Sequence, residues 1–298
     1  MEISSHFATA DEIYEEAFQQ HNKRLLELHR EYGLTDHTSL NKERCSWYKD
    51  PGAGSVFYAS RMWEYPFAIL SAEIKPGMKC ADIGCGTTPF TPYLCELAGK
   101  ENVTGFDPDP LQSDDNQYYA FGVKKSFLVK AGFNFQPDNL ADIHSPDESF
   151  DRVFCISVLE HIEQRDIQYR GIREMARILK PGGRLILTID LGIQMPLTNP
   201  FGLIQMSGLN PCGVVNFSWP EKRFLKVDKQ PMDVFGLVLE KSARKIQSGL
   251  NGGGQISEFE ATRRFAPEIT KDSTLQMQKD LANSGKLKVL SKLLLGKY

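Results

Sequence analysis

The chain has 298 residues, 41% of them hydrophobic and 24% charged, and its formal net charge at pH 7 is −3. This composition is typical of a folded globular protein and excludes a disordered chain, and the small negative charge offers no basic surface for nucleic acid. We find no apolar run long enough to span a membrane and no signal-like N-terminus, so we expect a cytoplasmic protein with six reduced cysteines and no nucleic-acid partner.

The first segment, residues 1–56, is predicted to be an N-terminal helical cap. Its helix begins at a capping box, Thr9-Ala-Asp-Glu12, and runs to Tyr32. Because this helix is polar, we expect His21 and His29 to be exposed to solvent.

A second helix is predicted just before the main strands, over residues 67–74. Arg61 and Tyr65 precede it and are spaced by one helical turn, so both can contact one ligand. The alternative is a surface ion pair between Arg61 and Glu64 beside a core Tyr65. The sequence leaves both interpretations open.

Residues 78–110 have the pattern of a nucleotide-binding βαβ unit. Its parts follow in order: strand Lys79–Asp82, turn Gly84-Cys85-Gly86, helix Phe90–Ala98, strand Val103–Phe106 and the terminal acid Asp107. Glycines in such a turn let the backbone approach a ligand, and the second-strand carboxylate can bind two ribose hydroxyls.

Details of the turn favour one nucleotide over another. A dinucleotide turn needs a third glycine, and Pro89 stands at that position, which argues against NAD. Asp82 lies two residues before the first glycine, where it can face a cationic ligand. S-adenosylmethionine (SAM) carries an ammonium and a sulfonium and no phosphate, so the turn suits it better than a pyrophosphate.

Three parts of the sequence resemble one family. Asp82-Ile-Gly-Cys-Gly86 with Asp107 resembles motif I and its acidic partner in class I SAM-dependent methyltransferases of the small-molecule, type 11 group. Phe150-Asp151 followed by Ser157-Val-Leu-Glu-His161, and Leu179-Lys-Pro-Gly-Gly-Arg-Leu185, are similar to later motifs of that family. The resemblance covers about residues 60–192.

The resemblance implies a doubly wound α/β fold, with a mainly parallel, seven-stranded, Rossmann-like sheet and an antiparallel last strand. Residues 57–240 would form the SAM-binding domain, with a substrate insert at about 193–222. The further strands are expected at 126–129 or 133–135, and at 152–156, 184–189, 223–227 and 234–240. An amphipathic helix is predicted over 166–180.

The resemblance also implies the residues that bind the cofactor. Arg61 or Tyr65 would contact the methionine carboxylate of SAM. Asn139 stands where the family has an aspartate for the adenine amino group, and an asparagine oxygen can still accept that hydrogen bond. The full predicted set is Arg61, Tyr65, Asp82, Gly84, Cys85, Gly86, Asp107, Pro108, Asn139, Leu140 and Ser157. No metal site is predicted.

Methyl transfer to a hydroxyl needs a base, and the candidates are His161 and Asp190. A histidine at a helix start can instead bond to the backbone, and Asp190 can instead cap the turn after its strand. The chain lacks the Asn/Asp-Pro-Pro-aromatic sequence of many N-methyltransferases, so we expect O-methylation of a small molecule or glycan. The alternatives are a non-catalytic SAM-fold binding protein that acts through its tail, and an NAD-dependent oxidoreductase.

The last segment, residues 241–298, is predicted to be a basic extension with eleven Lys/Arg and five Asp/Glu. Its final part, residues 284–298, places leucines on one arc among lysines, as in helices that lie on anionic membranes. The favoured alternative is that these leucines pack on the core or on a second subunit.

Overall fold

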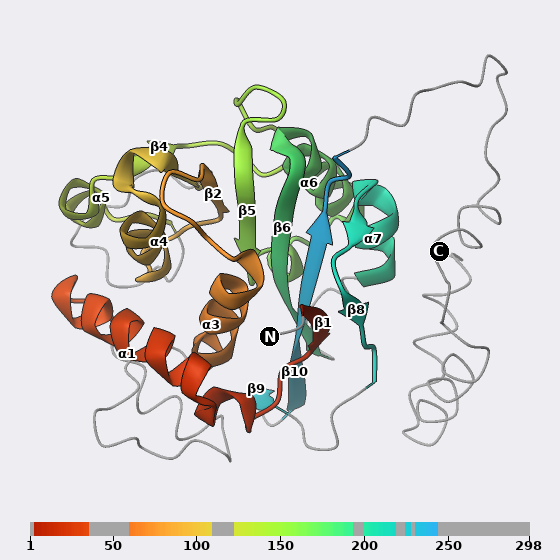
Figure 1. Ribbon diagram of the computed structural model, residues 1–298, viewed down its shortest axis with the longest axis horizontal. Helices are drawn as coiled ribbons and strands as arrows, with labels where there is room; N and C mark the ends of the chain where they lie inside the picture. Colours follow the sequence, from red (N-terminus) through yellow and green to blue (C-terminus); the bar gives the residue numbers. More distant parts are fainter. Residues whose placement is uncertain are drawn as a thin grey trace, which may run out of the picture. The chain divides into compact units, whose positions relative to one another are not determined.

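The computed structural model describes residues 3–35, 60–108, 122–192, 200–218, 224–227 and 230–243. Residues 36–59, the two ends of the predicted insert (193–199 and 219–222) and the extension after Ala243 lie outside the described residues. Within these ranges the strands form one sheet with helices on both faces (Figure 1).

The sheet begins with five parallel neighbours and continues with antiparallel pairing. The order is β4 (Asn134–Gln136), β3 (Val103–Phe106), β2 (Cys80–Ile83), β5 (Phe150–Ile156), β6 (Leu179–Gly192), β10 (Gln230–Glu240), β1 (Ser4–Phe7) and β8 (Val214–Val215), with β7 (Asn210–Pro211) and β9 (Leu225–Val227) also paired to β10. β10 runs antiparallel to β6, with Val234 opposite Asp190. The predicted doubly wound α/β fold with an antiparallel last strand is confirmed.

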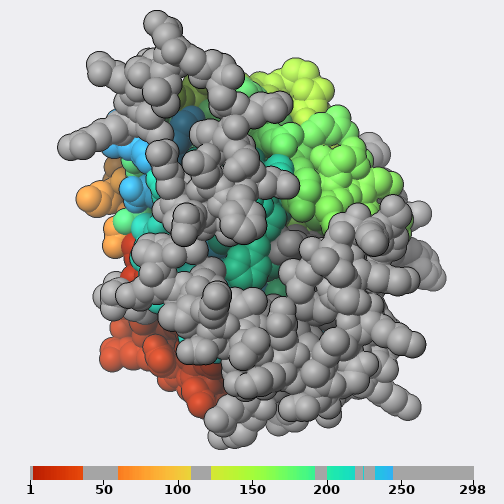
Figure 2. All heavy atoms as spheres, turned by 90° about the vertical axis from the view of Figure 1, so that its right-hand side faces the viewer, coloured from red at the N-terminus to blue at the C-terminus, as the bar shows by residue number. Residues whose placement is uncertain are grey.

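Side chains that alternate along the central strands fill two separate cores, as expected of a sheet covered on both faces. Phe154, Ile156 and Ile186 pack with α1 (Glu16–Glu31), α3 (Arg61–Ala72) and α4 (Phe90–Ala98). Val153, Cys155, Leu185 and Leu187 pack with α6 (Arg165–Ile178) and α7 (Pro200–Ser207). The green residues of α6 adjoin the teal residues of α7 on the face shown in Figure 2.

The N-terminal segment differs from the predicted helical cap because it also supplies a strand. β1 pairs with β10, with His6 opposite Gly236. Among the described residues the sheet therefore has ten strands, where seven were predicted. The third predicted strand is β4, the second of the two alternatives, because residues 126–129 belong to the helix α5 (Lys125–Ala131).

The capping box is present, but α1 begins four residues later than Glu12. The Thr9 N–H donates to Glu12 Oε2 at 3.0 Å, and a short 3-10 turn, η1 (Glu12–Tyr14), precedes the helix. The predicted exposure of His29 is wrong, and His21 is only partly exposed. His29 is 4% exposed, with Nε2 3.0 Å from the Thr35 carbonyl oxygen, and His21 Nδ1 lies 2.8 Å from the Tyr93 hydroxyl.

Helix α3 begins at Arg61 and not at residue 67, although Pro66 lies inside it. Proline has no N–H to donate to the carbonyl four residues before it, here that of Met62. The side-chain amide of Asn22, on α1, donates to that carbonyl at 2.8 Å and so replaces the missing bond. A contact from a distant helix thus lets α3 extend through the proline, and places Arg61 and Tyr65 one turn apart.

Candidate cofactor and acceptor site

The turn after β2 is built from backbone conformations that favour glycine. Gly84 and Gly86 have φ values of 73° and 51°, in the left-handed region. The Gly84 N–H donates to the Phe106 carbonyl at 2.7 Å, which ties the turn to the end of β3. A Cβ atom on Gly84 would lie 2.5 Å from Val158 Cγ2. The turn therefore packs directly on the segment that follows β5.

Asp107 lies beside this turn, as the βαβ pattern predicts. It is 6% exposed, and its Oδ2 accepts a hydrogen bond from the Gly86 N–H at 3.1 Å. Its own N–H donates to the Gln136 carbonyl at 3.2 Å, which anchors the end of β3 to β4. Pro108 follows and is exposed. The carboxylate is thus held in place at the carboxyl edge of the sheet.

The side chains of Asp82 and Cys85 are buried beneath the backbone of the turn. Asp82 is 3% exposed, and its Oδ2 accepts a hydrogen bond from Thr91 Oγ1, on α4, at 2.6 Å. Burial raises the pKa of Asp82 to about 7, against the Thr91 bond and with a further contribution from the charge of Asp107. Cys85 is 2% exposed and packs with the α5 region. A direct ligand contact by either residue stays a prediction.

The start of α3 reaches the turn from the other side. Tyr65 stacks on Phe90, with ring centroids 4.9 Å apart, and hydrogen-bonds Thr88 of the turn. Arg61 pairs with Glu64 and lies 6.0 Å from the centre of the Tyr65 ring. The alternative prediction, a surface ion pair between Arg61 and Glu64, names the correct partners. The pair is not at the surface, because Glu64 is completely buried.

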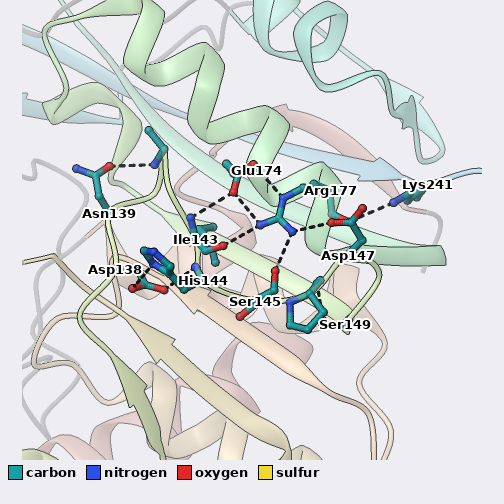
Figure 3. A network of polar contacts seen from close by, with 12 residues as sticks. Asp138, Asn139, Ile143, His144, Ser145, Asp147, Ser149, Glu174, Arg177 and Lys241 are labelled. Carbon is teal, nitrogen blue, oxygen red and sulfur yellow. Dashed lines mark hydrogen bonds and ion pairs between the residues drawn. The ribbon is translucent and has the colours of Figure 1, made fainter.

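Asn139 and Leu140 belong to the loop that joins β4 to β5, and Asn139 is labelled in Figure 3. Asn139 Oδ1 accepts a hydrogen bond from the Ala141 N–H at 2.9 Å, so one of its two acceptor sites serves the turn of the loop. Leu140 is 7% exposed and packs on Gly171 of α6, where a Cβ atom would lie 1.6 Å from Leu140 Cδ1. The other acceptor site of Asn139 can still take the predicted adenine contact.

A single arginine on α6 holds this loop (Figure 3). The Arg177 guanidinium donates to the Ile143 and Ser145 carbonyls and to Asp147 Oδ1, each at 2.8 Å. Glu174, one turn before it, accepts from Arg177 and also from the Ile143 N–H at 3.2 Å. We call Arg177 and Glu174 the loop clamp. The amphipathic pattern that predicts this helix does not show that Arg177 contacts the loop.

Ser157, at the end of β5, joins two carboxyl groups. Its Oγ lies 2.5 Å from Glu160 Oε1 and 3.5 Å from Asp190 Oδ2, and its φ of 54° is unusual for a non-glycine residue. The Asp190 N–H also donates to Glu160 Oε1 at 3.3 Å. Glu160 is completely buried and Asp190 is 5% exposed. Sequence reasoning missed Glu160, because nothing in Ser157–His161 indicates which side chain points inward.

Two residues of α3 complete this group. The Glu64 carboxylate accepts a hydrogen bond from Thr188 Oγ1 at 2.6 Å and pairs with Arg61. We call Glu64, Glu160 and Asp190 the carboxyl cluster. Burial raises the pKa of Glu160 to about 7, with the charge of Glu64 adding to the rise and that of Arg61 opposing it. Burial and the charge of Glu160 raise the pKa of Asp190 well above its usual range.

The two predicted bases differ in exposure. Asp190 does not cap a following turn, because β6 continues to Gly192 and pairs with β10 there. His161 ends the short 3-10 turn η3 (Leu159–His161) and is exposed. Burial of part of its ring and the charge of Arg61 lower the pKa of His161, which favours the neutral imidazole. A catalytic role for either stays a prediction.

Comparison with known proteins points to one kind of domain. Residues 81–187 match the family described as a methyltransferase domain. The chain is 31% identical over 134 residues to the ubiquinone/menaquinone biosynthesis C-methyltransferase UbiE of Shewanella sediminis, which covers 44% of this chain and 49% of that protein. It is 28% identical over 166 residues to the O-methyltransferase resE of Aspergillus sclerotiorum, with 55% and 58% covered.

A solved geranyl diphosphate C-methyltransferase from Streptomyces coelicolor A3(2) superposes with a TM-score of 0.45 at 11% identity, over 59% of this chain and 77% of that one. The chain spans about half the length of the curated relatives it matches. By its matched domain the chain is similar to the class I SAM-dependent methyltransferases of the type 11 group.

SAM is the cofactor of such domains, and the residues around the turn fit it. The turn has no side chain at Gly84 or Gly86, and the buried Asp107 carboxylate is fixed beside it. Within the described residues, no group of three or more His, Cys, Asp or Glu side chains is arranged to hold a metal ion. None of the described helices combines the length and the apolar character needed to cross a bilayer.

Proposed function

We propose that this chain is a SAM-dependent methyltransferase that methylates a hydroxyl group of a small molecule or a glycan. One observation carries the proposal. The glycine turn after β2 packs on Val158, which directly follows Ser157, and Ser157 contacts Glu160 and Asp190. A cofactor-binding turn and groups able to accept a proton thus meet at the carboxyl edge of the sheet, where α/β folds bind ligands.

The binding of SAM is assigned to residues on three sides of the turn. Asp107 would accept hydrogen bonds from the ribose, and Asn139 with Leu140 would contact the adenine. Arg61 and Tyr65 reach the turn from α3, where they can meet the methionine carboxylate. When bound, SAM supplies a methyl group on a sulfonium, and the sulfur keeps the electrons of the broken carbon–sulfur bond.

The choice of a hydroxyl acceptor is supported by the groups beside Ser157. A hydroxyl must lose its proton as its oxygen is methylated, so the reaction gains from a nearby base. The carboxyl cluster and His161, whose lowered pKa favours a neutral ring, lie on the side of β5 and β6. The names of the relatives do not decide between oxygen and carbon as the acceptor atom, since UbiE is described as a C-methyltransferase and resE as an O-methyltransferase.

Isothermal titration of the full chain with SAM, S-adenosylhomocysteine and NAD tests the cofactor. We expect binding of the first two and none of NAD. Transfer of a radiolabelled methyl group from SAM to a panel of alcohols, sugars, amines and carbon acids then tests the reaction. Failure of the folded chain to bind SAM would contradict the proposal. So would transfer to amines or carbon acids with none to hydroxyls.

A further inference from the structure

Glu160 and Asp190 are joined by contacts that use only one oxygen of each carboxyl group. Glu160 Oε1 lies 2.5 Å from Ser157 Oγ and 3.3 Å from the Asp190 nitrogen, and Asp190 Oδ2 lies 3.5 Å from the same hydroxyl. The other oxygens, Glu160 Oε2 and Asp190 Oδ1, are buried and have no hydrogen-bond partner among the described residues. Buried polar atoms are rarely left in this state.

A proton on this pair would make the burial of these oxygens less costly, because a neutral carboxyl group loses less than a carboxylate when it is removed from water. A serine hydroxyl has one hydrogen to donate, so Ser157 can donate to only one of the two carboxyl groups that it contacts. Two adjacent buried carboxylates are costly when both are ionised, and such pairs commonly keep one proton between them.

The charges around the two carboxyl groups do not compensate for a second negative charge. On α3, Arg61 is already paired with Glu64, so its charge is partly offset. On β5, burial raises the pKa of the Cys155 thiol well above its usual range, which keeps that thiol neutral. On η3, the lowered pKa of His161 favours its neutral form. Two carboxyl groups therefore face little uncompensated positive charge.

We propose that Glu160 and Asp190 hold one proton between them, and that this carboxyl pair, reached through the Ser157 hydroxyl, receives the proton that the acceptor hydroxyl loses. The inference rests on the proposed function. Ser157 is the contact residue, because it lies next to Val158, the residue against which the cofactor turn packs. Its left-handed backbone, anchored by the bond from its N–H to the Thr188 carbonyl at 3.0 Å, holds the hydroxyl over both carboxyl groups.

Every proton in this transfer is accounted for by the acceptor, Ser157 and the carboxyl pair. The pair starts with one proton and one free carboxylate. As the acceptor oxygen forms its bond to the methyl carbon, its proton passes to Ser157 Oγ, and the proton of Ser157 passes to the pair. The pair then holds two protons and releases one to water after the product leaves. Burial raises the pKa of Glu160 to about 7, which suits a group that cycles at neutral pH.

Infrared titration of the full chain without ligand tests the pair itself. We expect a protonated-carboxyl stretching band at neutral pH that disappears as the pH rises. Glu160→Gln and Asp190→Asn should each move this loss to lower pH, because each removes the neighbouring negative charge. Asp166→Asn, an exposed carboxylate on α6, is the matched control and should change nothing. A band unaltered by both cluster substitutions would overturn the proposal. Asp82→Asn identifies the separate band of Asp82.

The pH profile of kcat/KM tests the role of the pair. In the wild type it should rise with pH as the pair ionises. Glu160→Gln should lower kcat roughly 10²–10⁴-fold and remove the rise, with unchanged SAM affinity by titration calorimetry, and Glu160→Asp should restore part of it. Ser157→Ala should lower kcat more than it changes KM. A wild-type profile in Glu160→Gln would overturn the role. Failure of the wild type to bind SAM would reject the proposed function, while the infrared result would still decide on the pair.

Discussion

The two halves of the candidate site are built in different ways. The cofactor half, around β2 and β3, is made largely of backbone: two glycines in left-handed conformations and the N–H of Gly86 bonded to Asp107. The acceptor half, around β5 and β6, is made of side chains that come from α3, η3 and two strands. A backbone site leaves a readable local pattern in the sequence, and a side-chain site assembled from distant elements leaves almost none.

The largest effect is expected from a substitution that disturbs the contact between the two halves of the site. In Gly84→Ala, the new Cβ would lie 2.5 Å from Val158 and the residue would keep a left-handed backbone. We expect a loss of about 3 kcal/mol or more in SAM binding or in unfolding free energy. Gly77→Ala is the matched control, since its φ is 85° and no atom lies within 4 Å of the added methyl group. It should cost only about 1–2 kcal/mol, and equal effects would contradict the packing argument.

The second prediction isolates the cofactor half. Asp107→Ala should remove two hydrogen bonds to an ionised acceptor and weaken SAM binding by about 2–4 kcal/mol. Titration calorimetry on the folded variant measures this. Unchanged affinity would refute the ribose assignment, whereas a matching loss of SAM affinity in Glu160→Gln would mean that the two halves are not separable.

The third prediction isolates the acceptor half through stability alone. Burial raises the pKa of Glu160 from 4.5 to about 7 on folding. Between these pH values the folded chain holds a proton that the unfolded chain has lost, so the contribution of Glu160 to stability is greatest at low pH and is lost as the pH rises through this interval. In urea unfolding the free energy of unfolding should fall by about 3 kcal/mol over this interval in the wild type and by less in Glu160→Gln, because one pKa unit corresponds to about 1.4 kcal/mol. Parallel curves would show that Glu160 is ionised throughout.

The fourth prediction concerns the loop clamp, which supports the cofactor half from α6. Arg177→Gln should loosen the loop that carries Asn139 and Leu140, and weaken SAM binding by about 1 kcal/mol, on the scale of one hydrogen-bonded contact. Arg170→Gln is the control, because this arginine of the same helix is exposed and, among the described residues, its ion pair is with Asp166 at 3.9 Å. Equal SAM affinities of the two variants would show that the loop clamp does not contribute to SAM binding.

The smallest expected effect concerns His161. If the carboxyl pair takes the proton, His161→Ala should lower kcat by less than roughly tenfold, below the usual contribution of a general base. The measurement is kcat under saturating SAM and acceptor, with SAM affinity as its control. A loss of roughly 10²-fold or more would return the role of base to His161.

The sequence by itself determined the helix and strands around the cofactor half of the site to within about a residue. The predicted helix at 90–98 and strand at 103–106 coincide with α4 and β3, and the predicted strand at 79–82 is shifted by one residue in β2. Helical spacing, glycine turns and strand-ending acids act over a few neighbouring residues, so their effect on the backbone can be read without knowledge of the rest of the chain.

Only the tertiary structure decided what each polar side chain meets. Pro66 lies inside a helix because Asn22 satisfies the carbonyl it leaves unbonded, and His29 is buried although its helix is polar. The N-terminal segment supplies a strand because β10 offers it an edge. The structure brings together Glu64, Glu160 and Asp190, which are far apart in the chain. Burial and pairing depend on contacts between distant segments, and no local pattern encodes such contacts.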